Sequence, residues 1–487
     1  MITLVYALCI KDEQCSRYRY YSLGPTRRKY LNFRDLVSEL ESRGDLIRIR
    51  KAVNPEYELP ALLAQAEARD KACWFEHIAG SDFPAVGGVL TSVQRWTLGL
   101  GLSTDRFAAP NSLEQYITEA VAAPVAAIVA TTGPVCDVVI NGNDVDTASL
   151  PAPLFFSGDS HRFISAGVGF AQDPETGKQN VGFYRLPILD RRLVSVSTGP
   201  TSDLRRIYNL HRERGTKLQI AVAIGVAPSL QIAAAADIPA GIADIDVAGA
   251  LQRAPIELVK CQTSDIMVPA DAEFVIEVTV DLETWVDNTM GEYGDQYGKT
   301  TSPVATIDAI THRRDALFHV IMAGMGREHN QLGSLMAYRM RATILERLHD
   351  RHPNVRDVFA DMTPRRMGMR GQVAVSVDKT SDNQPDAIIN DVFAMQIGRF
   401  PMSMLMQRVV IVDTDVDIRD HQDVEWAIAS RTIHASQFSA HEDQTGRGAS
   451  VIRFGFDATA PLAQRTVMRR PDIPSAEQYD LDRYLQD

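Results

Sequence analysis

The sequence predicts a multidomain protein of the mixed α/β and β class. Its 487 residues are 45% hydrophobic, enough to fill two or three cores, because single cores seldom grow past about 250 to 300 residues. Short β-rich runs dominate residues 125–330, whereas the segments on either side combine helical and strand patterns. We therefore expect an α/β domain at each end and a β-dominated barrel or sandwich between them.

The N-terminal domain is expected to begin with a helix over residues 31–44, which Gly44 ends. Four apolar residues recur there at helical spacing, namely Phe33, Leu36, Val37 and Leu40. The elements expected next are a strand over 45–50, a helix over 58–70, a strand over 74–78 and a turn-rich stretch over 83–88. Residues 1–30 precede this pattern, and we interpret them as an N-terminal extension.

The central part is expected to be rich in strands, with few helices. Residues 202–215 predict a helix, with Ser202 and Asp203 as possible caps, and residues 246–254 predict a short one. The runs that predict strands are 125–130, 135–140, 180–189, 192–198, 218–226, 273–280 and 317–322.

The C-terminal part returns to an α/β pattern. Residues 332–350 predict one long amphipathic helix. Residues 408–418 predict a buried strand that runs to an acidic end, and residues 423–431 predict a further helix.

Composition excludes several classes of function. A formal net charge of −12 argues against a nucleic-acid-binding protein, which needs clustered Lys and Arg. No stretch approaches the roughly 20 apolar residues of a membrane span. The five cysteines form no CxxC pair, and their odd number leaves at least one thiol outside any disulfide framework, so we expect a cytoplasmic protein. Rossmann, P-loop, HExxH and GxSxG motifs are absent.

Asn180 and Arg185 interrupt an apolar stretch. A regular strand would place them on opposite faces, although a bulge at Gly182 could re-aim one of them. In isolation Arg185 is best read as a side chain that reaches solvent at a sheet margin. The functional alternative is a guanidinium fork that binds a carboxylate or a phosphate.

Two acidic clusters lie further along the chain. Glu292 and Asp295 sit among glycines in residues 290–298, where they form either a solvated acidic turn or carboxylates aimed at a ligand. Asp244 and Asp246 either ligate a hard cation or cap the helix that follows.

Taken in order, five segments resemble the UbiD family of prenylated-flavin-dependent decarboxylases, and the resemblance runs from residue 31 almost to the C-terminus. The segments are NVGFYR (180–185), IADIDVAGAL (242–251), ELVKCQTSDIMVPADAEFVIE (257–277), MGEYGDQYG (290–298) and RVVIVDTDVDIRDHQDVEWAIASR (408–431). The resemblance implies three parts after the extension. They are an N-terminal α/β domain (31–120), a flavin-reductase-like split β-barrel that binds prenylated FMN (121–325), and a linker helix with a C-terminal α/β oligomerisation domain (326–487).

The family's chemistry implies the function. It is the reversible, non-oxidative decarboxylation of an aromatic or α,β-unsaturated carboxylic acid, or its acyl derivative, through a covalent adduct with prenylated FMN. The flavin supplies an electron sink that no side chain provides. A divalent ion, Mn²⁺ or Mg²⁺, and K⁺ accompany it, a flavin prenyltransferase supplies it, and the chain is expected to form a homo-oligomer, a dimer or a hexamer. The alternatives are a non-catalytic UbiD-like subunit of a hetero-oligomer and a protein that binds plain FMN.

The resemblance also assigns roles to residues of this chain. Arg185 holds the substrate carboxylate, and Asp295 or Glu292 handles the proton. Asn180 and Asp244 are the expected metal ligands. The residues expected to contact the cofactor are Asn180, Val181, Gly182, Phe183, Tyr184, Arg185, Ser202, Asp244 and Arg399.

Three positions depart from the family pattern. Ser202 stands where the family usually has a metal-ligating His, and Met290 stands where its motif has a first Glu, with Glu292 two positions on. Pro401 replaces a Lys that meets the cofactor phosphate, and Arg399 is the nearby substitute.

Overall fold

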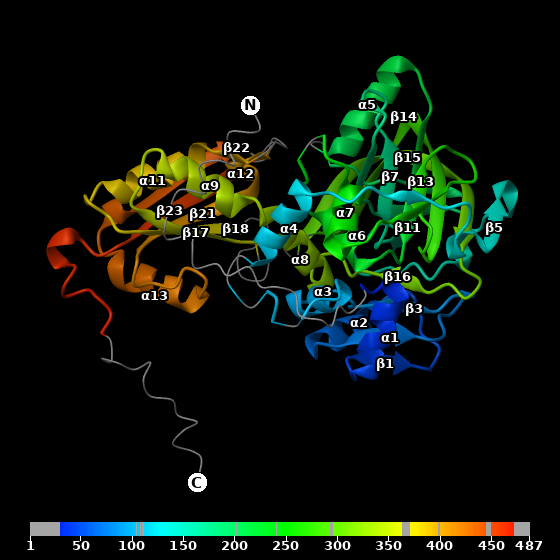
Figure 1. The fold of residues 1–487 in the computed structure, drawn as a ribbon, viewed down its shortest axis with the longest axis horizontal. Helices are drawn as coiled ribbons and strands as arrows, with labels where there is room; N and C mark the ends of the chain where they lie inside the picture. Colours follow the sequence, from blue (N-terminus) through cyan, green and yellow to red (C-terminus); the bar gives the residue numbers. More distant parts are fainter. Residues whose placement is uncertain are drawn as a thin grey trace, which may run out of the picture.

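The computed structural model describes residues 30–471, except for positions 104, 108, 110–111, 200–201, 240, 293–295, 363–370, 398–399 and 445–449. Its chain forms two lobes (Figure 1). The larger lobe holds the N-terminal and central parts, and the smaller lobe holds the C-terminal part. The expected mixture of α/β and β folds is confirmed, while the residue limits of the three domains stay a prediction. The N-terminal extension lies outside the described residues.

A four-stranded sheet forms the base of the larger lobe, in the order β1-β2-β3-β16. Its strands are β1 (Leu46–Ile49), β2 (Ala72–Phe75), β3 (Ala85–Gly87) and β16 (Phe318–Val320). The last strand comes from residues that we expected in the central domain, and it pairs in parallel with β3. The turn-rich stretch 83–88 therefore contains a strand.

Three helices accompany this sheet, α1 (Phe33–Ser42), α2 (Glu58–Ala68) and α3 (Val93–Gly99). The first confirms the prediction for residues 31–44, since its four spaced apolar side chains are all buried. Its N-cap is Asn32, whose side chain accepts a hydrogen bond from the Asp35 amide at 2.9 Å, and Gly44 follows with φ +71°, a conformation that glycine adopts without strain.

A nine-stranded antiparallel sheet forms the centre of the larger lobe. Eight strands follow the order β6-β9-β10-β15-β14-β11-β7-β8, and β5 pairs with β15. Their bounds are β5 (Val138–Asn141), β6 (Phe163–Ile164), β7 (Val168–Gln172), β8 (Gln179–Phe183), β9 (Leu186–Asp190), β10 (Leu193–Ser195), β11 (Leu218–Ile224), β14 (Phe274–Glu292) and β15 (Gln296–His312). The long β14–β15 hairpin carries Glu292 at its end.

Helices and a small sheet surround this centre. The helices are α4 (Ser112–Ala122), α5 (Asp203–Arg214), α6 (Pro228–Ala235) and α7 (Asp244–Gln252). The small sheet joins β4 (Ile128–Val129), β12 (Glu257–Lys260) and β13 (Met267–Pro269). Helix α6 was not expected from the sequence.

The smaller lobe is a five-stranded sheet in the order β17-β18-β21-β23-β22. Its three central strands run in parallel, and the two edge strands are antiparallel to their neighbours. The strands are β17 (Val355–Asp361), β18 (Gly371–Val377), β21 (Met406–Asp413), β22 (Phe438–Gln444) and β23 (Ser450–Ala458). The predicted buried strand with an acidic end is β21, and this prediction is confirmed.

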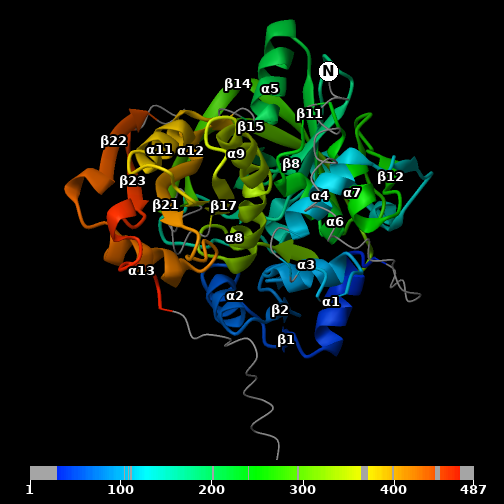
Figure 2. The ribbon, with the colours of Figure 1, turned by 60° about the vertical axis from the view of Figure 1, so that its left-hand side comes forward.

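Helices cover both faces of this sheet (Figure 2). Helices α9 (Met340–His349) and α11 (Gln384–Ala394) pack on one face, and α13 (His421–Arg431) packs on the other. The short helix α12 (Met402–Leu405) and the strand pair β19 (Gln396–Ile397) and β20 (Phe400–Pro401) complete the lobe.

The prediction of one helix over residues 332–350 is wrong. The segment comprises the end of α8 (Arg327–Gly333), a 3₁₀ turn (Ser334–Ala337) and α9. Leu332 and Leu335 pack into a core of the larger lobe, whereas Ile344 and Leu348 pack into the core of the smaller one. The segment breaks because its apolar residues serve two cores that one straight stripe cannot reach.

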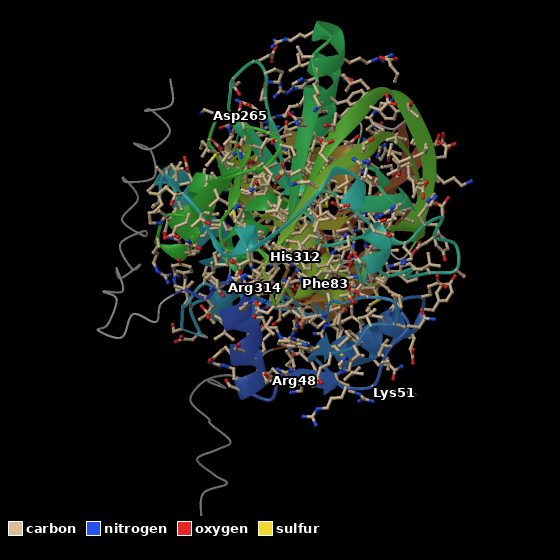
Figure 3. The ribbon with its side chains drawn as sticks, turned by 90° about the vertical axis from the view of Figure 1, so that its right-hand side faces the viewer. Arg48, Lys51, Phe83, Asp265, His312 and Arg314 are labelled. Carbon is tan, nitrogen blue, oxygen red and sulfur yellow. The ribbon has the colours of Figure 1, made fainter. Side chains whose placement is uncertain are left out.

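Aromatic contacts join the N-terminal and central parts. The ring of Phe83, just before β3, lies edge-on to His312 at the end of β15, with 5.0 Å between ring centroids. Figure 3 labels both residues at this junction. No helix in the described part of the chain is long and apolar enough to cross a membrane. The described cysteines, Cys73, Cys136 and Cys261, are free, and Cys9 and Cys15 lie outside the described residues.

Candidate functional site

The β7–β8 hairpin positions the stretch that begins at Asn180. Its register is continuous, with Gly182 opposite Gly169 and Phe183 opposite Val168, so the suggested bulge at Gly182 is wrong. The strand instead ends at Phe183, and the next amide, that of Tyr184, donates to the Gly167 carbonyl at 3.0 Å. This break in the strand, rather than a bulge, re-aims Arg185.

Tyr184 folds back over the two paired glycines. A Cβ on Gly169 would lie 2.5 Å from the Tyr184 ring, and one on Gly182 would lie 3.1 Å from its hydroxyl, so both positions need glycine for this packing. The Asn180 side-chain nitrogen donates to that hydroxyl at 2.9 Å. This bond holds the side-chain nitrogen of Asn180 on the Tyr184 hydroxyl and leaves Oδ1 of Asn180 as the atom that could ligate a cation.

The remaining residues of the stretch are partly or fully covered. Val181 is 6% exposed and belongs to the core, and Phe183 packs against the same core. The contact of the backbone from Val181 to Tyr184 with a cofactor stays a prediction.

Arg185 lies in the short link between β8 and β9, and its guanidinium contacts the end of the β14–β15 hairpin. Its Nη1 donates to the Gly291 carbonyl at 3.1 Å, and its Nη2 forms an ion pair with Oε1 of Glu292. The two side chains are 20% and 22% exposed. Arg185 is therefore paired with a carboxylate from a distant segment and does not simply reach solvent.

Glu292 packs closely against two glycines, Gly298 and Gly324. A Cβ on Gly298 would lie 2.2 Å from Cγ of Glu292, and a Cβ on Gly324 would lie 3.0 Å from its carbonyl oxygen. Gly324 also has φ +73°, which favours glycine. Glu292 is thus a fixed, half-buried group rather than part of a solvated turn.

His329 lies close enough to this pair to feel the charges of both residues, and no motif in the sequence marks it. It lies in α8, and its Nδ1 accepts a hydrogen bond from the Gly324 amide at 2.9 Å. Burial, together with the charge of Arg185, lowers the pKa of His329 to about 4, and Glu292 acts in the opposite direction. A neutral imidazole that accepts at Nδ1 carries its hydrogen on Nε2, so His329 is a neutral hydrogen-bond donor beside Arg185 and Glu292.

Asp244 lies at the start of α7, which packs against β8. Burial raises the pKa of this carboxyl group to about 7, the Val181 amide opposes that rise, and Asp203 and Asp237 add to it. Asp244 therefore contacts β8 at Val181, the residue after Asn180. This places Asp244 near Asn180, as binding of one metal ion by both residues requires. Asp246 instead accepts from the Ala127 amide at 3.0 Å.

The capping alternative for these two aspartates is not observed, because the N-cap of α7 is Ala243 and no side chain caps it. Ser202 does act as a cap. Its hydroxyl accepts from the Arg205 amide at the start of α5 at 3.2 Å and donates to the Gly199 carbonyl at 2.8 Å. The serine at the position of the family's histidine is thus committed to the local fold.

The side chains of Asn180 and Asp244 are of the chemical type that binds a hard divalent ion. Asn180 offers an amide oxygen and Asp244 a carboxylate, the ligand types that Mg²⁺ and Mn²⁺ prefer. Within the described residues, no group of three or more His, Cys, Asp or Glu side chains could hold a metal. The set therefore fits an ion that completes its shell with phosphate and water, as Mg²⁺ often does.

The other positions singled out from the sequence contribute less. Met290 is 1% exposed and lies in the core, so the residue that replaces the motif's first Glu brings no polar group. Asp295 and Arg399 lie outside the described residues, and so does the side chain of Pro401.

The chain is similar to known proteins over most of its length. Three family models match successive parts of the chain, described as the N-terminal (residues 37–109), Rift-related (127–326) and C-terminal (333–438) domains of 3-octaprenyl-4-hydroxybenzoate carboxy-lyase, UbiD. An uncharacterized protein in the cooM 5′ region of Rhodospirillum rubrum is 28% identical over 441 residues, which span 88% of this chain and 91% of that protein.

Solved structures are similar over nearly the whole chain. The UbiD-class enzyme HmfF from Pelotomaculum thermopropionicum, in complex with FMN, is 29% identical with a TM-score of 0.80, over 93% of this chain and all (100%) of that chain. An evolved dimeric form of the same enzyme with prFMN is 28% identical with a TM-score of 0.77, over 93% and 99%. All three parts of the chain thus match one family, and the chain belongs to the UbiD family of carboxy-lyases.

Proposed function

We propose that this protein catalyses the reversible, non-oxidative decarboxylation of an aromatic or α,β-unsaturated carboxylic acid, or its acyl derivative, with prenylated FMN as the cofactor. One observation carries the proposal. The Arg185 guanidinium is held beside Glu292 by an ion pair and a backbone hydrogen bond, with both side chains partly exposed. An anchored guanidinium next to a carboxyl group suits an acid that binds, loses CO₂ and gains a proton.

Arg185 binds the substrate carboxylate in this proposal. Its contacts with Gly291 and Glu292 use one N–H on each terminal nitrogen, and a guanidinium carries five N–H groups. Donors therefore remain for an incoming carboxylate. Glu292 keeps the guanidinium in place while the substrate binds, which lowers the cost of ordering the long Arg side chain.

Glu292 or Asp295 exchanges the proton with the substrate carbon. His329 would offer its Nε2 hydrogen to the substrate carboxylate and adds no positive charge, because its pKa is about 4. A neutral donor orients a carboxylate without raising the cost of releasing neutral CO₂. The three side chains thus divide binding, proton transfer and orientation among them.

Prenylated FMN, when bound, supplies the electron sink for cleavage of the bond to CO₂. The proposal draws support from the HmfF structures, which contain FMN and prFMN. Asn180 and Asp244 would hold a divalent ion, Mn²⁺ or Mg²⁺, next to the cofactor phosphate, with K⁺ nearby. The backbone from Val181 to Tyr184, together with Ser202 and Arg399, would complete the cofactor contacts.

The proposal extends to location and assembly. A flavin prenyltransferase would supply the cofactor in the cytoplasm, and the chain would assemble into a homo-oligomer, a dimer or a hexamer. The dimeric form of HmfF supports an oligomer.

Expression with and without a flavin prenyltransferase tests the proposal. We expect prenylated flavin in the first case, detected by absorbance and mass, and CO₂ release or substrate deuterium exchange with a panel of aromatic and unsaturated acids. Arg185→Ala should lower turnover at least about a hundredfold with flavin retained. Arg192→Ala is a matched control, since Arg192 donates to Asn143 and Ile307 and, among the described residues, to no group of this site. No flavin under either condition, or normal turnover by Arg185→Ala, would contradict the proposal.

A further inference from the structure

A tight turn over residues 155–160 lies against the end of the β14–β15 hairpin, and its centre is Asp159. The carboxylate of Asp159 accepts the Gly291 amide at 2.9 Å and the Phe156 amide at 3.0 Å. The Asp159 amide donates to the Phe156 carbonyl at 3.0 Å, which closes the turn. Asp159 is 9% exposed, and none of the chemistry described above uses it.

Asp159 and Arg185 hold Gly291 from its two sides. Asp159 binds the amide that precedes the Gly291 Cα, and Arg185 binds the carbonyl that follows it, at 3.1 Å. A Cβ on Gly291 would lie 2.4 Å from the Phe156 ring, so the turn also fills the space that a side chain would need. The backbone at Gly291 is therefore fixed by an anion, a cation and a ring.

The rest of the turn is tied to the same hairpin. The Ser160 amide and hydroxyl donate to the Thr289 carbonyl at 2.9 and 3.0 Å, and the Thr289 amide donates back to the Ser160 hydroxyl at 2.6 Å. The Gly158 amide donates to the Tyr297 hydroxyl at 2.9 Å. The turn thus contacts both strands of the hairpin, next to Glu292.

Glu292 has little room to absorb a shift of Gly291. It follows Gly291 directly, its side chain lies on Gly298, and its backbone lies on Gly324, where Cβ atoms would come within 2.2 and 3.0 Å. Gly298 and Gly324 have no side chain that could move aside to make room. A displacement of Gly291 must therefore move Glu292 relative to Arg185. Displacements of about 1 Å in such a site can cost about a hundredfold in rate.

We propose that Asp159 is a positioning residue for the Arg185–Glu292 pair. Its carboxylate fixes the Gly291 amide and so sets where the Glu292 carboxyl group and the Gly291 carbonyl meet the Arg185 guanidinium. In this role Asp159 acts through the backbone of Gly291 and not on the substrate. The catalytic consequence rests on the proposed function, whereas the structural consequence does not.

Two substitutions and a control test this role in the full chain with flavin bound. Asp159→Ala removes both acceptors, and Asp159→Asn is nearly isosteric and keeps one acceptor oxygen. Asp146→Ala is the matched control. Asp146 accepts the Ala148 amide at 2.9 Å in a turn that, like the turn at Asp159, lies between β5 and β6. We expect Asp159→Ala to lower kcat about 10- to 100-fold with KM within about threefold and bound flavin unchanged, Asp159→Asn to recover part of kcat, and Asp146→Ala to match the wild type.

Hydrogen exchange separates this inference from the proposed function. In Asp159→Ala the Gly291 amide should exchange about tenfold faster, since it loses its acceptor, while peptides from β21 exchange as in the wild type. If the wild type shows no turnover, the proposed function fails, and faster exchange confined to residues 289–292 still supports the positioning role. Unchanged exchange at Gly291, an unchanged kcat, or a loss of activity that only tracks lost flavin would each overturn it.

Discussion

Glu67 is a buried carboxyl group that ties the N-terminal domain to α8, the helix that carries His329. It is 2% exposed, its Oε2 accepts the Arg327 amide at 2.6 Å, and its Oε1 has no partner. Glu328, 0% exposed, lies nearby and accepts the Val89 and Leu90 amides at 3.0 and 2.9 Å. Burial raises the pKa of Glu67 to about 7, the Arg327 amide opposes the rise, and Glu328 adds to it.

The raised pKa makes stability depend on pH in a defined direction. The ordinary pKa is 4.5 and the folded one about 7, so between these values the folded state binds more protons than the unfolded state. The free energy of unfolding must then fall as pH rises. At about 1.36 kcal/mol for each pH unit, the stabilisation present below pH 4.5 loses about 3 kcal/mol by pH 7 to 8.

Glu67→Gln should remove this loss, because Gln keeps an acceptor for the Arg327 amide and does not ionise. Thermal and denaturant unfolding of wild type and variant between pH 4.5 and 8.5 would measure it. We expect similar stability near pH 4.5 and a variant more stable by up to about 3 kcal/mol at pH 8. Glu56→Gln, an exposed substitution just before the same helix, serves as the control. Parallel pH profiles for Glu67→Gln and the wild type would refute the reasoning.

Three further predictions concern the proposed site. Because the pKa of His329 is about 4, kcat/KM should show no limb near pH 6.5, and His329→Gln should lower kcat about tenfold without reshaping the profile; a limb that only the wild type shows would contradict this. Asp244→Asn should lower Mn²⁺-dependent retention of flavin on dialysis at least about tenfold with unchanged circular dichroism, and unchanged retention would remove Asp244 from the metal end. Gly169→Ala should cost about 1 to 3 kcal/mol of stability, since its Cβ would lie 2.5 Å from the Tyr184 ring, so a wild-type melting temperature would argue against the tight packing.

The elements that sequence reasoning predicted well are those with local causes. Helix α1 follows from the spacing of its apolar residues, and α5 begins at its predicted cap, Ser202. Strand β16 also exists where its apolar run predicts it, but its partner is β3, more than 200 positions away. Strand pairing is set by tertiary packing, which a local pattern does not contain.

The candidate site divides in the same way. Asn180 and Arg185 stand out because polar residues interrupt one apolar stretch, and the structure brings Arg185 to Glu292. The predicted bulge at Gly182, which was to re-aim Arg185, is wrong, because the strand ends at Phe183 instead. A strand that bulges and a strand that ends can both contain a Gly followed by an aromatic residue, so the sequence does not distinguish them. His329 and Asp159 were missed, since neither has a motif. Asp159 acts through the amide of Gly291, which is distant in the chain, and the role of His329 depends on its burial beside Arg185 and Glu292, which the sequence does not show.

The two ends of the proposed site are built differently, and this bears on how the chain would bind its ligands. At the carboxylate end, Arg185, Glu292 and His329 are fixed by ion pairing, by the Gly324 amide and by Gly291. Such a preformed site binds an anion with little ordering cost.

The metal end is less complete. The Ser202 hydroxyl is committed to the cap of α5, and Asn180 is oriented by Tyr184 so that Oδ1 remains as a ligand. Only Asp244 adds a carboxylate among the residues assigned to that end. A divalent ion there must take most of its ligands from the cofactor phosphate and water, so ion and flavin should bind together and leave together. Removal of the divalent ion by a chelator should therefore release flavin while leaving the Arg185–Glu292 pair intact.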